Sequence, residues 1–141
     1  MVDDEIFEFK TLEAGENPQF DNFFKNSFMH FYLRCPEFQD LDDDLRLLVA
    51  NDKCAQIRKM GKFMVGFDKF YPTVFYTYTA YTLSENKLYL HMAYVKKNFR
   101  GFGFFKHSLD VLKESANEYY YTLPIKLKRK YYLPEFERKS L

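Results

Sequence analysis

The chain has 141 residues, of which 47% are hydrophobic and 21% aromatic, and its formal net charge is +1. This length and apolar content predict a single domain, residues 1–141, with a sizeable core. No apolar run approaches the roughly 20 residues of a membrane helix, and the acidic start MVDDEIFEF argues against an import or secretion signal. We therefore expect a cytoplasmic protein without a membrane partner, in which Cys35 and Cys54 are free thiols.

The charges are unevenly distributed along the chain. Acidic residues dominate the first third, whereas Lys and Arg dominate from Lys96 onward, most densely over residues 126–130. This division would suit a cationic substrate beside an anionic cofactor, and it would equally suit two solvated faces. Both interpretations stay open at this point.

The hydrophobic pattern changes between helical and strand spacing several times. We expect, in order, a strand over 5–12, helices over 18–33 and 41–50, strands over 55–60, 62–70, 74–83 and 87–95, a helix over about 103–118, a strand over 119–125, a helix over 126–132 and a strand over 133–141. The order predicts an α+β fold with a mixed, largely antiparallel central sheet flanked by helices.

Local signals mark where the first two helices begin and end. Asn17 is expected to cap the first helix, and Pro18 suits a first helical position. The Cys35-Pro36 pair ends that helix, because the residue before proline disfavours helical backbone. Four residues of the second helix are expected to face inward: Leu41, Leu45, Leu48 and Val49.

The stretch from Val95 to Leu112 joins a strand to a helix through a basic, glycine-bearing turn. A strand, a glycine turn and a helix N-terminus together present unpaired backbone N–H groups to an anion. Glycine suits such turns because they often need positive φ and a close backbone approach. Lys96, Lys97 and Arg100 add positive charge, so the turn predicts a phosphate-bearing ligand.

The spacing Val95-x4-Arg100-Gly101-x-Gly103 resembles the cofactor signature of the GNAT family of acyl-CoA N-acyltransferases. With Arg100 as the first residue of the family pattern, Phe105 stands where a small residue is expected. With Asn98 as the first residue, Asn replaces the usual Arg or Gln. The resemblance covers nearly the full chain and implies the element order β-α-α-β-β-β-α-β-α-β.

A second resemblance lies near the C-terminus. The family often places a tyrosine five residues before the phenylalanine of a Gly-Phe pair. Here Tyr131 stands five residues before Phe136, and Glu135 replaces the glycine. The resemblance implies that Tyr131, or Tyr132 with a shift of one residue, returns a proton to the leaving thiolate.

The resemblance further implies an acetyl-CoA-dependent N-acyltransferase in which a primary amine attacks the acetyl group directly. The pyrophosphate would bind N–H groups of roughly residues 99–104, and the pantetheine arm would lie beside residues 92–95, where an N–H polarises the carbonyl. His91 is the candidate base, although the role of an ordinary strand histidine is the larger expectation. The expected cofactor-binding residues are Ala93, Val95, Asn98, Arg100, Gly101, Gly103 and Phe104.

Two other functions remain open from the sequence. The octapeptide RGFGFFKH, residues 100–107, is similar to the first motif of RNA-recognition domains, where it must form a strand with base-stacking aromatics. A helical pattern follows it almost at once, which makes a nucleic-acid partner the lesser expectation. Alternatively, the many tyrosines would suit a catalytically inactive protein of the same fold that binds a protein partner or a second copy of itself.

Overall fold

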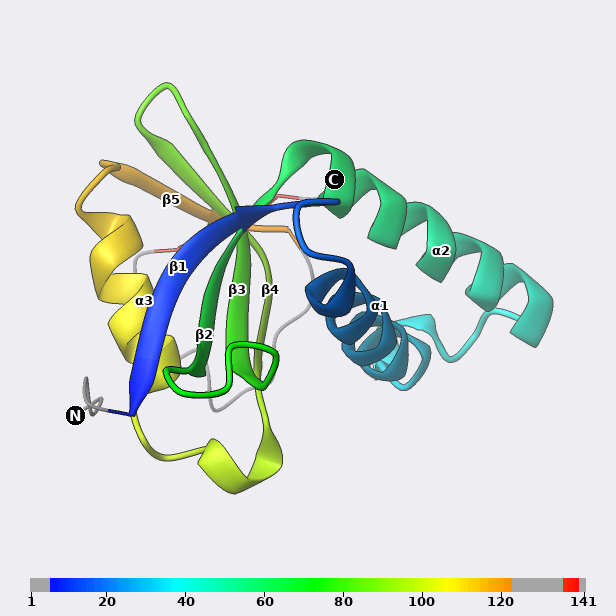
Figure 1. Ribbon diagram of the computed structural model, residues 1–141. Coiled ribbons are helices and arrows are strands. Elements are labelled where there is room, and N and C mark those ends of the chain that lie inside the picture. The colour runs from blue at the N-terminus through cyan, green and yellow to red at the C-terminus, as the bar shows by residue number, and fades with distance from the viewer. Residues whose placement is uncertain (1–5, 123–135, 140–141) are drawn as a thin grey trace.

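The computed structural model describes residues 6–122 and 136–139, and in these ranges it contains one mixed six-stranded sheet (Figure 1). Neighbouring strands are antiparallel from β1 to β4, whereas β5 lies parallel to β4 and β6 parallel to β5. The predicted α+β fold with a largely antiparallel sheet is confirmed. The strands are β1 (Phe7–Glu13), β2 (Lys62–Asp68), β3 (Phe75–Ser84), β4 (Lys87–Val95), β5 (Glu118–Tyr121) and β6 (Glu137–Arg138).

Helices cover both faces of the sheet. Helices α1 and α2 lie on one side and α3 on the other (Figure 1). No helix within the described ranges has the length and apolar character needed to cross a membrane. The helices are α1 (Pro18–Leu33), α2 (Asp43–Met60) and α3 (Phe104–Lys113), and two short 3-10 turns are η1 (Pro36–Phe38) and η2 (Lys97–Phe99).

A phenylalanine stripe fixes α1 on the sheet. The side chain of Asn17 accepts hydrogen bonds from the N–H groups of the first turn, which confirms the predicted cap. The aromatic residues at four-residue spacing lie on one face of the helix, and burying each ring stabilises the fold by roughly 1.5–3 kcal/mol. The buried aromatic side chains of α1 are Phe20, Phe24, Phe28 and Tyr32.

Helix α2 corrects two predictions from the sequence. Residues 55–60, expected as a strand, continue the helix that was expected to end at residue 50. The reason is the spacing of Ala50, Cys54 and Ile57, which places one continuous buried stripe on the core. Leu45 and Leu48, expected to face inward, are exposed, Leu48 by 67%.

The second face of the sheet packs against α3. This helix ends at Lys113, earlier than predicted, and β5 begins at Glu118. Of the strand expected over 133–141, the structure shows β6, and the helix expected over 126–132 lies outside the described residues. The buried cluster on this face comprises Met64, Tyr81, Leu88, Leu90, Leu109, Leu112 and Phe136.

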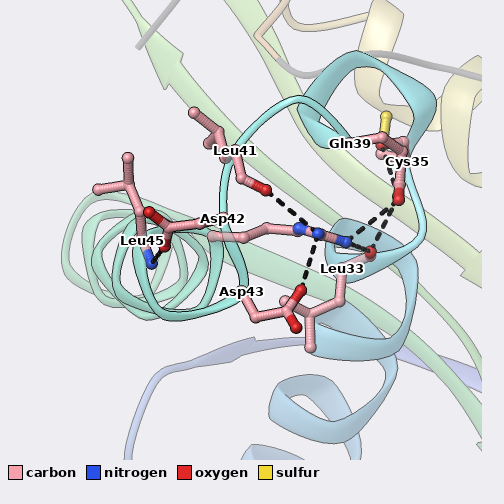
Figure 2. A network of polar contacts seen from close by, with 8 residues as sticks. Leu33, Cys35, Gln39, Leu41, Asp42, Asp43 and Leu45 are labelled. Atoms are coloured by element: carbon pink, nitrogen blue, oxygen red, sulfur yellow. Dashed lines mark hydrogen bonds and ion pairs between the residues drawn. The ribbon is translucent and has the colours of Figure 1, made fainter.

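The connection between α1 and α2 is held by one guanidinium group (Figure 2). Nη1 of Arg46 donates to the Leu33 carbonyl and the Gln39 side chain at 3.2 and 3.1 Å. Nη2 donates to the Leu41 carbonyl at 3.2 Å and to Asp43 at 3.0 Å. These bonds satisfy carbonyl groups at and beyond the end of α1, and the Leu33 carbonyl also accepts from Nε2 of Gln39 at 3.1 Å.

The buried free cysteines, Cys35 and Cys54, confirm the prediction of unpaired thiols.

Candidate functional site

The turn after β4 is built on two left-handed glycines. β4 ends at Val95, the 3-10 turn η2 follows, and α3 starts at Phe104. Gly101 has φ 94° and Gly103 has φ 84°, a region that costs other L-residues roughly 1–2 kcal/mol. The strand, glycine turn and helix expected from the sequence are therefore present in that order.

The N-terminus of α3 lacks a side-chain cap. Gly103 is the N-cap residue, and the first turn carries no acidic residue. The backbone N–H groups of a first helical turn have no acceptor within the helix. The N–H groups of Phe99 and Arg100 already donate within the 3-10 turn, at 2.9 and 3.4 Å. The donors available to an anion therefore run from Gly101 to Phe104, a narrower set than the sequence predicts.

Basic side chains surround this turn. Nε of Arg100 donates to the carbonyl of Val95 at 3.0 Å, which closes the turn across five residues. Arg100, Lys97 and Asn98 are exposed. Nζ of Lys96 lies 5.5 Å from the centroid of a phenylalanine ring on α1. The turn therefore combines backbone donors with positive charge, which favours an anionic ligand.

An aromatic cluster supports the turn from the sheet side. The ring of Phe99 lies 4.2 Å from that of Tyr76, and the ring of Phe104 lies 4.8 Å from that of Phe7. Tyr76 also donates to Asp68 at 2.6 Å. Burial, together with this hydrogen bond, raises the pKa of Tyr76 to about 12. Phe7 and Tyr76 are not among the site residues predicted from the sequence; the alternation of phenylalanines in β1 is the available signal.

The ring of Phe104 belongs to the core, and the partly buried ring of Phe105 packs against it. Phe104 is 1% exposed, and Phe105 packs against the buried clusters on this face of the sheet. The Phe105 ring, which breaks the family pattern, is thus accommodated beneath the helix. The RNA-binding alternative is not favoured, because residues 100–107 form a turn and a helix and the buried Phe104 cannot stack on a base.

His91 lies at a bulge in β4. Leu90 and Met92 pair with consecutive residues of β3, so His91 is an extra residue in the strand. Its Nε2 lies 2.7 Å from the hydroxyl of Thr82, which also donates to a carbonyl at the end of α2 at 3.1 Å. Its Nδ1 lies 2.8 Å from the hydroxyl of Thr122, directly after β5. The side chain therefore joins three elements at the bulge.

The surroundings of His91 keep its ring neutral. The side chain is 3% exposed, and burial lowers its pKa to about 4. Both ring nitrogens hydrogen-bond to threonine hydroxyl groups. A neutral imidazole bonded in this way fits a structural role, and its role as a base remains a prediction.

The N–H groups of β4 alternate between the side of β3 and the opposite side. The N–H of Lys96 donates to the carbonyl of Tyr76 on β3 at 2.9 Å. Along an antiparallel strand, alternate residues point their N–H groups to opposite sides. The N–H groups of Ala93 and Val95 therefore point away from β3. Val95 is the last residue of β4, so this edge of the strand ends where the glycine turn begins.

Tyr131 and its alternative Tyr132 lie outside the described residues. Phe136, which follows them in the family pattern, is buried and its ring lies 5.2 Å from that of Tyr119. Among the described residues, the structure joins Arg100 of the turn to Val95 of β4 by a hydrogen bond, whereas His91 is bonded to Thr82 and Thr122.

Comparisons with known proteins identify the fold. No protein-family model matches the chain, and no curated protein matches its sequence. Among solved structures, a ribosomal-protein-alanine N-acetyltransferase from Brucella melitensis biovar Abortus 2308 has a TM-score of 0.57 and 16% identity, covering 96% of this chain and 94% of its own.

Two further structures give the same result. A "predicted acetyltransferase with acetyl-CoA" from Clostridium acetobutylicum has a TM-score of 0.54 and 14% identity, covering 91% of this chain and 87% of its own. An acetyltransferase of the GNAT family from Staphylococcus aureus Mu50 has a TM-score of 0.52 and 15% identity, covering 89% of this chain and 79% of its own. At this level of identity the likeness concerns the fold, and the chain has the acyl-CoA N-acyltransferase fold of GNAT proteins.

Proposed function

We propose that the chain is an acetyl-CoA-dependent N-acyltransferase that transfers the acetyl group to a primary amine. The observation that carries this proposal is the start of α3, where a left-handed glycine turn leaves the backbone donors without a side-chain cap. A pyrophosphate supplies the acceptors and the negative charge that such a site favours. The fold adds support, since the Clostridium acetobutylicum structure is described as an acetyltransferase with acetyl-CoA.

The turn and β4 would share the binding of acetyl-CoA. N–H groups from Gly101 to Phe104 would hold the pyrophosphate, and Arg100 would add charge-assisted hydrogen bonds. Val95 would present its N–H group to the pantetheine arm or the acyl carbonyl, which is an oxyanion-hole role, and Ala93 lies two residues earlier on the same edge of β4. The buried aromatic rings under the turn keep these donors in place.

The reaction requires two proton transfers around one bond exchange. The amine nitrogen bonds to the acyl carbon as the carbon–sulfur bond breaks. Tyr131 would give its proton to the departing thiolate. The ammonium nitrogen must lose a proton. The Thr82 hydroxyl donates its hydrogen to a carbonyl, so Nε2 of the neutral ring donates to Thr82, and His91 could receive a proton only at Nδ1, through the hydroxyl of Thr122.

The function is tested by thiol release from acetyl-CoA in the presence of an amine panel containing a polyamine, an aminoglycoside, a lysine peptide and a free peptide N-terminus. We expect one class to be acetylated, and we expect Tyr131→Phe to bind acetyl-CoA normally while turnover falls roughly 10²- to 10⁴-fold. Tyr120→Phe, on β5, is the control for loss of a phenol group. Unchanged turnover in Tyr131→Phe would remove this residue from the mechanism. If acetyl-CoA neither binds nor reacts, the proposed N-acyltransferase activity is refuted.

A further inference from the structure

The glycine turn carries one well-exposed aromatic ring. Phe102 is 48% exposed, whereas Phe104 in the same motif is buried. The neighbouring glycines, Gly101 and Gly103, set the backbone of the turn by their positive φ angles. The fold therefore does not need a large apolar side chain at position 102, and the exposed ring calls for another explanation.

The ring of Phe102 is supported from behind. Its centroid lies 6.3 Å from that of Phe99 and 6.2 Å from that of Phe104, with tilted planes. Both of these rings pack in turn on the cluster of Phe7 and Tyr76. A ring held in this way loses little conformational freedom when a flat ligand packs on its exposed surface.

We propose that Phe102 stacks on the adenine of the coenzyme, an inference that rests on the proposed function. The pyrophosphate of CoA joins the pantetheine arm to the adenosine 3′-phosphate. If the arm follows β4 and the pyrophosphate binds at the start of α3, the adenosine leaves on the outer side of the turn. Phe102 and the exposed Lys97 lie on this turn, and they offer an aromatic surface and a cation to the base and the 3′-phosphate. Phe102 thus makes the site select the complete nucleotide over a ligand that ends at the phosphopantetheine.

The proposal is tested by calorimetric titration with three ligands: acetyl-CoA, adenosine 3′,5′-bisphosphate and S-acetyl-4′-phosphopantetheine. Phe102→Ala is expected to weaken the binding of acetyl-CoA and of adenosine 3′,5′-bisphosphate roughly 5- to 150-fold, the range of one base–aromatic stack. The affinity for S-acetyl-4′-phosphopantetheine is expected to stay unchanged. Phe102→Trp is expected to restore affinity. Phe70→Ala removes a ring that is 72% exposed on the loop between β2 and β3, and it is expected to leave all three affinities unchanged.

Each other outcome overturns the proposal in a recognisable way. Equal acetyl-CoA affinity in wild type and Phe102→Ala refutes the stacking role and leaves the proposed function standing. If Phe102→Ala loses as much affinity for S-acetyl-4′-phosphopantetheine as for acetyl-CoA, Phe102 supports the turn and does not bind the base. If the wild type binds no acetyl-CoA, the proposed function fails and the inference falls with it. Oligoadenylate RNA that binds more tightly than acetyl-CoA, and depends on Phe102, would replace the coenzyme with nucleic acid.

Discussion

Helices α1 and α2 begin in the opposite way from α3. Oδ1 of Asn17 accepts from the first-turn N–H groups of α1 at 3.0 and 3.1 Å, and Oδ1 of Asp42 accepts from the N–H of Leu45 in α2 at 2.8 Å. Both helices also carry acidic residues in their first turn. Helix α3 begins at Gly103 with neither feature.

Under the proposed function, this difference separates structural helix ends from one that binds a ligand. A side-chain cap contributes about 1 kcal/mol to stability, and α1 and α2 obtain it from their own sequence. The start of α3 lacks that contribution, and under the proposed function its donors bind an anion from outside the chain. The buried His91 is comparable to the capped starts of α1 and α2, because the chain itself supplies hydrogen-bond partners for both ring nitrogens.

The largest expected effect follows from placing a carboxylate at the uncapped helix. We expect Gly103→Glu to lower acetyl-CoA affinity at least about 100-fold, because the carboxylate repels the pyrophosphate and occupies its donors. Calorimetry measures the loss. Gly15 shares the left-handed backbone, with φ 86° and open space around the Cβ position, so Gly15→Ala is the matched control for backbone strain and should bind normally. Normal binding by Gly103→Glu would refute the assignment of the turn.

The second-largest expected effect concerns His91, whose two ring nitrogens have hydrogen-bond partners within the chain. The pKa of His91 is lowered to about 4 by burial, so the unfolded chain takes up a proton first as the pH falls. The contribution of His91 to stability is complete above about pH 6.5 and is lost as the pH falls toward 4, by up to about 3 kcal/mol. Urea unfolding of the wild type and His91→Gln from pH 7 to 4 measures this. Parallel pH profiles would contradict the neutral, bonded ring.

A smaller effect is expected for the guanidinium group beside the turn. Arg100→Gln should weaken acetyl-CoA binding roughly 10-fold, within the range of a charge-assisted hydrogen bond, and the loss should shrink at high salt. Arg34→Gln, at the exposed end of α1, removes the same charge elsewhere and should change little. Equal losses in the two variants would reduce the role of Arg100 to the overall charge.

The smallest expected effect separates stability from binding. Asn17→Ala removes the cap of α1 and should lower the free energy of unfolding by about 1 kcal/mol. The acetyl-CoA affinity of the folded protein should stay unchanged, because the cap lies outside the glycine turn. Denaturant titration and calorimetry on the same samples provide both values. A cap variant that loses coenzyme affinity would break the division between the two kinds of helix end.

The sequence predicts the elements that local patterns determine. The run of β-branched and aromatic residues in β3, the Asn17 cap and the two glycines after β4 all depend on residues close in the chain. Helix α2 was divided wrongly because residues 55–60 contribute only Ile57 to the buried stripe, which continues from Ala50. A short apolar segment of this kind does not distinguish a strand from a helix by periodicity.

The parts of the site that the sequence missed depend on contacts between distant residues. Phe7 and Phe104 meet through the sheet and not through local spacing, and the same is true of His91 and Thr122. Phe105 breaks the family pattern in sequence, yet its ring packs against the core. The direction of a side chain, and not its identity alone, decides whether it obstructs a binding site.

Calorimetric titration of the wild type with acetyl-CoA, together with its thermal unfolding, tests the central claim most directly. We expect saturable one-site binding that is competed by CoA. At a concentration 100 times the dissociation constant, the ligand should stabilise the folded state by about 2.7 kcal/mol. No heat and no thermal stabilisation at millimolar acetyl-CoA would contradict the claim that the uncapped start of α3 is a coenzyme site.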